Sequence, residues 1–240
     1  SQINGATTSS EITIWPSTLV GILSGGTAVV LQANNDITVS EAITASNSGN
    51  GGNLTMQAGR TIDINANITT DNGNLTLTAN ETLANGVVDG ERDSGNAEIN
   101  LTGATINTGT GTFTATISAG ADKTNSGTAD ITLNTVTAAS LVMTNNGTTA
   151  GSDILDSGVL TVSGTSSFTT VGDGVITLDS ANALTGAVTL NTGSSANATV
   201  DNGTTALIIA ESNVGGTLTL TSGATAGIID TMATASGTVT

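Results

Sequence analysis

The sequence contains an internal repeat, and this repeat limits what the chain can fold into more than any other feature. Residues 53–79 read NLTMQAGRTIDINANITTDNGNLTLTA, and the opening NLTMQA at 53–58 returns as NLTLTA at 74–79. Within the unit, aliphatic and polar residues alternate in three short runs separated by Gly and Asn, which is typical of short β-strands joined by turns. Three strands that return to their starting phase predict one coil of a β-solenoid.

A second copy of the unit precedes the first. LQANNDITVSEAIT at 31–44 matches MQAGRTIDINANIT at 56–69, which aligns Leu31 with Met56, Ile37 with Ile62, Val39 with Ile64 and Ile43 with Ile68. In each triplet the outer residues are aliphatic and the middle residue is polar. Because side chains alternate along a strand, we expect the aliphatic residues to point inward and the polar ones outward.

The same pattern continues to the end of the chain and predicts one continuous rod over residues 1–240. Residues 1–27 are expected to form an N-terminal incoming and capping segment, with a short helix over 18–24, Ser17 as its N-cap and Gly25-Gly26 as its stop. Residues 80–96 interrupt the rhythm and predict a protruding loop, and 151–158 are also loop-like. Dividing the chain by the repeat length gives roughly ten coils.

Composition supports a layered core and excludes several function classes. Aromatic residues make up only 1% of the chain, so the core must be thin and built from stacked small and β-branched side chains. A net charge of −16 would repel nucleic acid and anionic bilayers. No apolar run is long enough to span a membrane. The absence of Cys and His excludes disulfides, thiolate chemistry and the commonest acid–base catalyst.

The ends of such a rod carry a functional expectation. The chain starts at Ser1 without Met and stops at Thr240 within a strand-like stretch, so we expect a piece of a longer protein or a subunit that continues into the next. Terminal coils expose open strand edges, which ordinarily are capped or paired with another chain. We therefore expect end-to-end self-association, within one giant chain or between subunits.

Six stretches resemble the filamentous haemagglutinin-like exoproteins, the two-partner-secretion type of bacterial adhesin. They are 13–43 (TIWPSTLVGILSGGTAVVLQANNDITVSEAI), 53–80 (NLTMQAGRTIDINANITTDNGNLTLTAN), 90–101 (GERDSGNAEINL), 127–147 (GTADITLNTVTAASLVMTNNG), 151–170 (GSDILDSGVLTVSGTSSFTT) and 212–223 (SNVGGTLTLTSG). The resemblance implies an all-β fold, a right-handed parallel β-helix, secretion, and a role in adhesion or extracellular matrix. It supplies no catalytic residue.

Two groups of acidic residues are candidate sites. Asp89, Glu91 and Asp93 alternate in the 80–96 loop, as in a calcium loop, although Gly and Glu are not at the positions that such a loop requires. Asp153 and Asp156 are candidates to pair with another acid in a glycosidase, which needs two carboxylates facing one sugar bond. The other acids are expected to lie singly, without a cluster on adjacent coils, so we expect no enzyme, and no cofactor beyond calcium as the open alternative.

The outward Thr residues are the third candidate. Seven are expected to face solvent from flat strands, namely Thr76, Thr78, Thr161, Thr177, Thr189, Thr219 and Thr221. A regular Thr array is how β-helical ice-binding proteins work, although Thr is also simply a good strand former. The sequence thus predicts an extracellular structural rod of a bacterial surface adhesin or fibre, with host or cell-surface glycans or proteins as further partners. A glycan- or ice-binding module is the alternative, and a polysaccharide-active enzyme is the least favoured.

Overall fold

The chain folds into three parallel β-sheets that wind around one core. The computed structural model describes residues 12–82, 84, 86–119, 129–148 and 151–231. Sheet A is β1 (Val29–Ala33), β4 (Leu54–Ala58), β7 (Leu75–Ala79), β10 (Thr112–Ile117), β13 (Ser140–Asn145), β16 (Ser166–Thr170), β19 (Ala187–Asn191), β21 (Leu207–Ile209) and β23 (Ile228–Asp230). Sheet B is β2 (Ile37–Val39), β5 (Ile62–Ile64), β8 (Ile99–Asn100), β11 (Ile131–Leu133), β14 (Ile154–Asp156), β17 (Ile176–Leu178), β20 (Ala198–Asp201) and β22 (Leu218–Thr221). Sheet C is β3 (Ile43–Thr44), β6 (Ile68–Thr69), β9 (Ile106–Asn107), β12 (Val136–Ala138), β15 (Leu160–Val162) and β18 (Ala183–Leu184).

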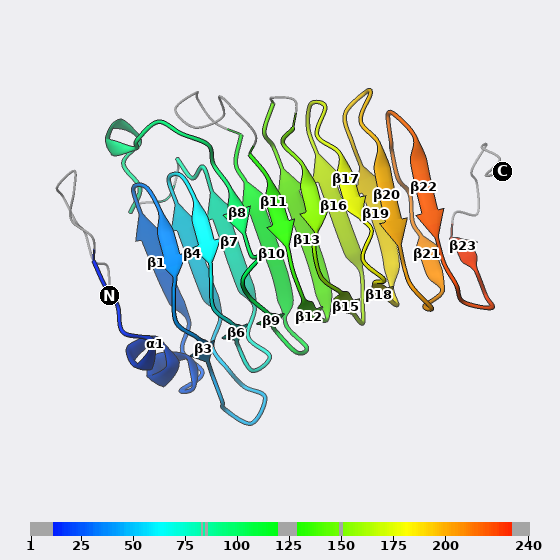
Figure 1. The fold of residues 1–240 in the computed structure, drawn as a ribbon. Coiled ribbons are helices and arrows are strands. Elements are labelled where there is room, and N and C mark those ends of the chain that lie inside the picture. The colour runs from blue at the N-terminus through cyan, green and yellow to red at the C-terminus, as the bar shows by residue number, and fades with distance from the viewer. Residues whose placement is uncertain (1–11, 83, 85, 120–128, 149–150, 232–240) are drawn as a thin grey trace.

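Each strand pairs in parallel with the strands one coil away, which is the predicted β-solenoid (Figure 1). Both repeat alignments are confirmed by the register: Leu54 lies opposite Leu75, and Leu31 lies opposite Met56. The nine strands of sheet A give eight coil-to-coil steps, fewer than the roughly ten coils expected. The difference has two causes. The division by the repeat length counted the residues before β1, and the coils from β7 to β10 and from β10 to β13 are longer than the repeat unit, since Leu77 lies opposite Ala115 and Ala115 opposite Met143.

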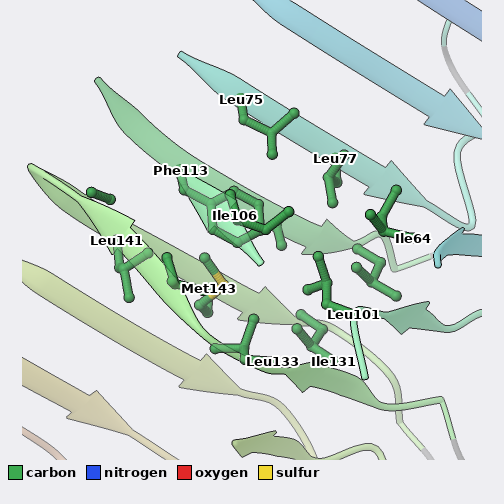
Figure 2. Close-up of a cluster of buried hydrophobic side chains, with 14 of the residues drawn as sticks. Ile64, Leu75, Leu77, Leu101, Ile106, Phe113, Ile131, Leu133, Leu141 and Met143 are labelled. Carbon is green, nitrogen blue, oxygen red and sulfur yellow. The ribbon is translucent and has the colours of Figure 1, made fainter. Parts of the chain in front are cut away.

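The core is one continuous stack of aliphatic side chains. The inward positions of successive coils fall in register, so Leu75, Phe113 and Leu141 lie one above another and are at most 1% exposed (Figure 2). Both core phenylalanines have a small inward neighbour two positions away on the same strand: Phe113 has Ala115, and Phe168 has Ser166. Phe113 and Ser166 share one inward register position of sheet A, and Ala115 and Phe168 share the next. Each of these two coils therefore holds one large and one small side chain, which keeps the volume of the core layers similar.

Polar side chains form ladders at the corners, as expected for stacked coils. Asn53 Oδ1 accepts a hydrogen bond from the Asn74 backbone N–H at 2.9 Å, and Asn74 Oδ1 accepts one from Thr112 N–H at 2.9 Å. On the outer face of sheet A, Gln32 Nε2 donates to Gln57 Oε1 at 2.9 Å. Each ladder supplies hydrogen-bond partners to backbone or amide groups that the hydrogen bonds between strands do not pair.

The short N-terminal helix is confirmed, but two local expectations were wrong, namely its N-cap at Ser17 and the loop at 151–158. The helix α1 (Pro16–Leu23) begins with a proline in its first turn and Trp15 as N-cap, without a side-chain capping bond, because proline is preorganised for that position. Segment 151–158 is not a loop: it contains β14, whose inward residues are Ile154 and the buried Asp156. Because the inward residue Asp156 is acidic rather than aliphatic, the sequence does not show the alternation that predicts a strand.

Replacing Ser166 by alanine should stabilise the protein by about 1 kcal/mol. Ser166 stacks between Leu141 and Val188, is 1% exposed, and its Oγ has no hydrogen-bond partner among the described residues. Removing a buried, unsatisfied hydroxyl removes its desolvation penalty. Urea denaturation of Ser166→Ala, with the outward Ser167→Ala as control, measures the effect. A loss of stability specific to Ser166→Ala would contradict this account.

Candidate functional site

The three calcium candidates lie in segment 80–98 between β7 and β8, which we call the back-folded loop. This loop includes the short 3₁₀ helix η1 (Asp89–Glu91) and returns to the first two coils (Figure 1). Glu91 Oε2 accepts a hydrogen bond from Asn34 Nδ2 at 2.7 Å, and Val88 N–H donates to Asn34 Oδ1 at 2.7 Å. The loop therefore fastens a later coil to the corner between β1 and β2.

Arg92 anchors the back-folded loop. Its side chain is fully buried and pairs with Asp89 Oδ1 at 2.7 Å. One terminal nitrogen, Nη1, also donates to the Gly59 carbonyl oxygen at 3.0 Å and to Asn80 Oδ1 at 2.7 Å. A guanidinium that is buried with several oriented acceptors holds its surroundings rigidly.

The carboxylates of Asp89, Glu91 and Asp93 are directed to different partners. Asp89 binds Arg92 and Glu91 binds Asn34. The pKa of Arg60 is raised, first by its hydrogen bond to Asp36 and in smaller part by the charge of Asp93. In the part of the chain that the structure describes, no three acidic side chains form a group that could hold a metal ion. Calcium binding by these residues stays a prediction.

Asp153 and Asp156 do not share a face, because residues three apart on a strand point to opposite sides. Asp156 is 8% exposed and accepts hydrogen bonds from the N–H groups of Asp179 at 2.9 Å and Ser180 at 3.2 Å and from Asn182 Nδ2 at 2.7 Å. Asp153 Oδ1 accepts from Val175 N–H at 2.8 Å. Both carboxylates are acceptors for the next coil's backbone, which is a structural role.

An acidic column on sheet B was missed by the sequence analysis. Glu98, Asp130 and Asp153 precede β8, β11 and β14, so they occupy the same register position on three consecutive coils. Burial raises the pKa of Asp130. The hydrogen bond from Asp153 N–H lowers this pKa, whereas the charges of Asp153 and Glu98 raise it further. The expectation that acids lie singly was wrong, since the unequal lengths of these coils hid the alignment.

The column ends at a shallow hollow near the back-folded loop. The residues that line it are Asp36, Arg60, Thr61, Asp63, Gly95, Asn96 and Glu98. Arg60 Nε donates to Asp36 Oδ1 at 2.8 Å, so one acid of this hollow is neutralised. Burial would raise the pKa of Asp36, but the bonds from Arg60 and Thr61 N–H lower it on balance, whereas burial and the charge of Asp36 raise the pKa of Asp63.

Mild acidification should stabilise the fold. Burial raises the pKa of Asp63, Asp130 and Asp156 above the ordinary value of 3.8. A carboxyl with a raised folded-state pKa binds its proton preferentially in the folded state, so stability rises as pH falls through that pKa toward 3.8. Asp36, whose pKa is lowered, opposes this only at lower pH. Melting followed by circular dichroism should give a higher Tm in mild acid than near neutrality. An Asp156→Asn variant should show a smaller rise, and an equal rise would exclude that residue as a cause.

The predicted outward Thr residues do face outward, but on three different sheets. Thr76, Thr78 and Thr189 lie on sheet A, Thr177, Thr219 and Thr221 on sheet B, and Thr161 on sheet C. The longest aligned series is on sheet A, where Thr78, Thr116, Thr144 and Thr169 occupy one register position. From β1 to β21 the strands of sheet A contain no charged residue, so this face is neutral in a chain of net charge −16.

The two ends of the solenoid differ. At the N-terminal end, Leu19 and Leu23 of α1 are 6% and 0% exposed and belong to the core, so the helix covers part of the first coil, whose Leu31 and Ile37 are partly buried. At the C-terminal end, Leu218 of β22 is 39% and Ile228 of β23 is 44% exposed. Their register partners in the preceding coil, Ala198 and Leu207, are fully buried. Among the described residues, the inward positions of the last coil are therefore more exposed than those of the coils before it, and pairing through open ends stays a prediction.

Comparison of the chain with models of protein families, with curated proteins and with solved structures found no match. Among the described residues, no helix is long and apolar enough to cross a membrane. The structural observations on this chain are therefore the support for a functional proposal. They are a continuous parallel solenoid, a neutral face on sheet A, and two unlike ends.

Proposed function

We propose that this protein is a structural rod segment of an extracellular adhesin or fibre at the bacterial cell surface. The observation that carries the proposal is the uninterrupted parallel β-solenoid with one stacked core. Its hydrogen bonds run from coil to coil along the whole rod, which gives a stiff shaft. The six stretches that resemble the filamentous haemagglutinin-like exoproteins support the same assignment. No catalytic activity is proposed.

The proposal includes self-association through the ends of the rod, with host or cell-surface glycans or proteins as further partners. Eight coil-to-coil steps of about 4.8 Å give a shaft of about 40 Å, so a longer fibre requires further coils or further copies. The net charge of −16 opposes side-by-side packing. Contact at the ends keeps the charged shafts apart along most of their length.

Negative-stain electron microscopy of the purified chain tests the assembly, and antibody labelling of intact source cells tests the location. We expect filaments of uniform width that lengthen with protein concentration and salt, and labelling before permeabilisation. Single short particles at every concentration would contradict self-association, and labelling only after lysis would contradict the extracellular role. A chelator arm tests calcium: filaments that disperse with chelator and return with Ca²⁺ would support the Asp89, Glu91 and Asp93 prediction.

The neutral face of sheet A favours a second candidate, a module that binds ice or a neutral glycan. The matched test compares Thr116→Lys and Thr144→Lys on sheet A with Thr161→Lys on sheet C in assays of ice recrystallisation and of binding to insoluble polysaccharide. Loss of an activity only with the sheet A variants would support this candidate. No activity in the unmodified chain would exclude it.

A further inference from the structure

We propose that two copies of this rod pair face to face through the outer surface of sheet A. This pairing goes beyond the end-to-end self-association proposed above and does not depend on it. Both copies would use the same surface, so the contact is isologous and closes as a dimer. The charge of the face, its area and the residue at its centre each support the pairing.

Sheet A is a broad side of the shaft that two anionic rods can bring together. The chain carries 19 acidic and 3 basic residues, and none of them lies in the strands of sheet A from β1 to β21. Sheet B, by contrast, has Asp63 and Asp201 on its outer face and is flanked by the acidic column. Two facing copies of sheet B would place like charges opposite each other, whereas two facing copies of sheet A would not.

Area distinguishes sheet A from sheet C, whose strands are also uncharged. The strands of sheet A from β1 to β19 contain five or six residues each, whereas the strands of sheet C contain two or three. At about 4.8 Å between strands and about 3.3 Å per residue, sheet A offers about 600 Å² on each copy. A pair would therefore bury about 1,200 Å² in total, the lower limit of standard protein interfaces.

The outward side chains of sheet A suit a protein contact because they are mostly short and stiff. On the middle strands β10, β13 and β16 they are Thr, Ser and Val. β-branched side chains have few χ1 rotamers, so little conformational entropy is lost when a partner covers them. A Thr hydroxyl both donates and accepts, so facing Thr residues can supply each other's hydrogen bonds.

Val142 is the apolar residue at the centre of this face. It points outward from β13, the fifth of the nine strands, and is 38% exposed, whereas its neighbours Leu141 and Met143 point into the core (Figure 2). It interrupts a column of residues with hydroxyl groups, namely Thr76, Thr114 and Ser167. The two-fold axis of an isologous contact over the whole face passes near this centre, so Val142 would meet Val142 of the second copy. An apolar centre inside a polar rim is the usual anatomy of a protein interface.

Sedimentation equilibrium of the full chain tests the pairing, and we expect a reversible dimer with a Kd on the order of 10 μM. Val142→Lys should raise this Kd by about tenfold or more, because it places two like charges at the centre of the contact. Val159→Lys is the matched control and should leave the Kd unchanged, since Val159 is 40% exposed but lies directly before β15 of sheet C. Circular dichroism confirms that both variants are folded. A monomer at every concentration, or unimpaired dimerisation of Val142→Lys, would overturn the pairing.

Cross-linking locates the contact, because the chain has no Cys of its own. Facing sheets pack about 10 Å apart, which is too far for a disulfide, so a short bismaleimide is the suitable probe. Val142→Cys should be cross-linked into dimers, and Val159→Cys should not. Equal cross-linking of the two variants would show that the contact is not centred on sheet A.

Electron microscopy separates this pairing from end-to-end assembly. The two contacts together would give filaments two rods wide, and Val142→Lys should reduce them to one rod. Closed dimers without filaments would support the pairing and contradict the proposed self-association. Filaments one rod wide from the unmodified chain would overturn the pairing and leave that self-association standing.

Discussion

Phe113→Ala is expected to destabilise the protein by about 4 kcal/mol, because it removes a large, fully buried side chain from a close-packed layer. Phe113 stacks between Leu75 and Leu141 in the inward column of sheet A (Figure 2). Its strand neighbour Ala115 is too small to fill the space. Chemical denaturation followed by far-ultraviolet circular dichroism gives the free energy of unfolding.

The double variant Phe113→Ala/Ala115→Phe provides the sharper test. It reproduces the arrangement of β16, where the small residue Ser166 precedes the large residue Phe168. If layer volume rather than residue position determines stability, the double variant should recover a large part of the loss. A double variant that is less stable than Phe113→Ala alone would show that each column tolerates only its own residue sizes.

Arg92→Ala is expected to cost about 3 kcal/mol and to detach the back-folded loop. The substitution removes a fully buried guanidinium and leaves the Gly59 carbonyl oxygen and Asn80 Oδ1 without this donor. Arg92→Lys should recover little, because a single ammonium cannot reproduce the planar fork. Limited proteolysis with mass spectrometry should locate new cleavage within residues 80–98, while denaturation measures the free energy.

The exposed pair of Arg60 and Asp36 provides the control. Arg60→Ala removes a salt bridge whose side chains are 26% and 34% exposed, and surface pairs contribute at most about 1 kcal/mol. The two arginine variants should therefore differ clearly. Equal losses, or an uncleaved loop in Arg92→Ala, would contradict the role assigned to Arg92.

The strand register could be predicted from the sequence because each coil repeats the same inward triplet. The alignments of Ile37 with Ile62 and of Ile43 with Ile68 are confirmed as parallel pairs. The prediction was wrong where an inward position holds a polar residue: Asp156 concealed β14. Such a residue is tolerated because other coils or corners supply its hydrogen bonds, and the alternation pattern alone does not show this.

The sequence identified candidate residues by their chemical type, but it did not show which of them lie together. The back-folded loop joins Val88 to Asn34, which lies far earlier in the chain, and no local pattern encodes that contact. The acidic column of Glu98, Asp130 and Asp153 appears only once the unequal coil lengths are known. The neutral face of sheet A can be recognised only once the strands from β1 to β21 are known to lie side by side, because no single strand sequence indicates it.

The parallel stacking of coils has a mechanical consequence. Hydrogen bonds between strands run along the rod, so tension between its two ends loads the bonds of one coil at a time rather than all together. Each coil of the repeat length would release roughly 70–85 Å of extended chain as it unwinds. Under load the rod would lengthen in steps and dissipate work at each step.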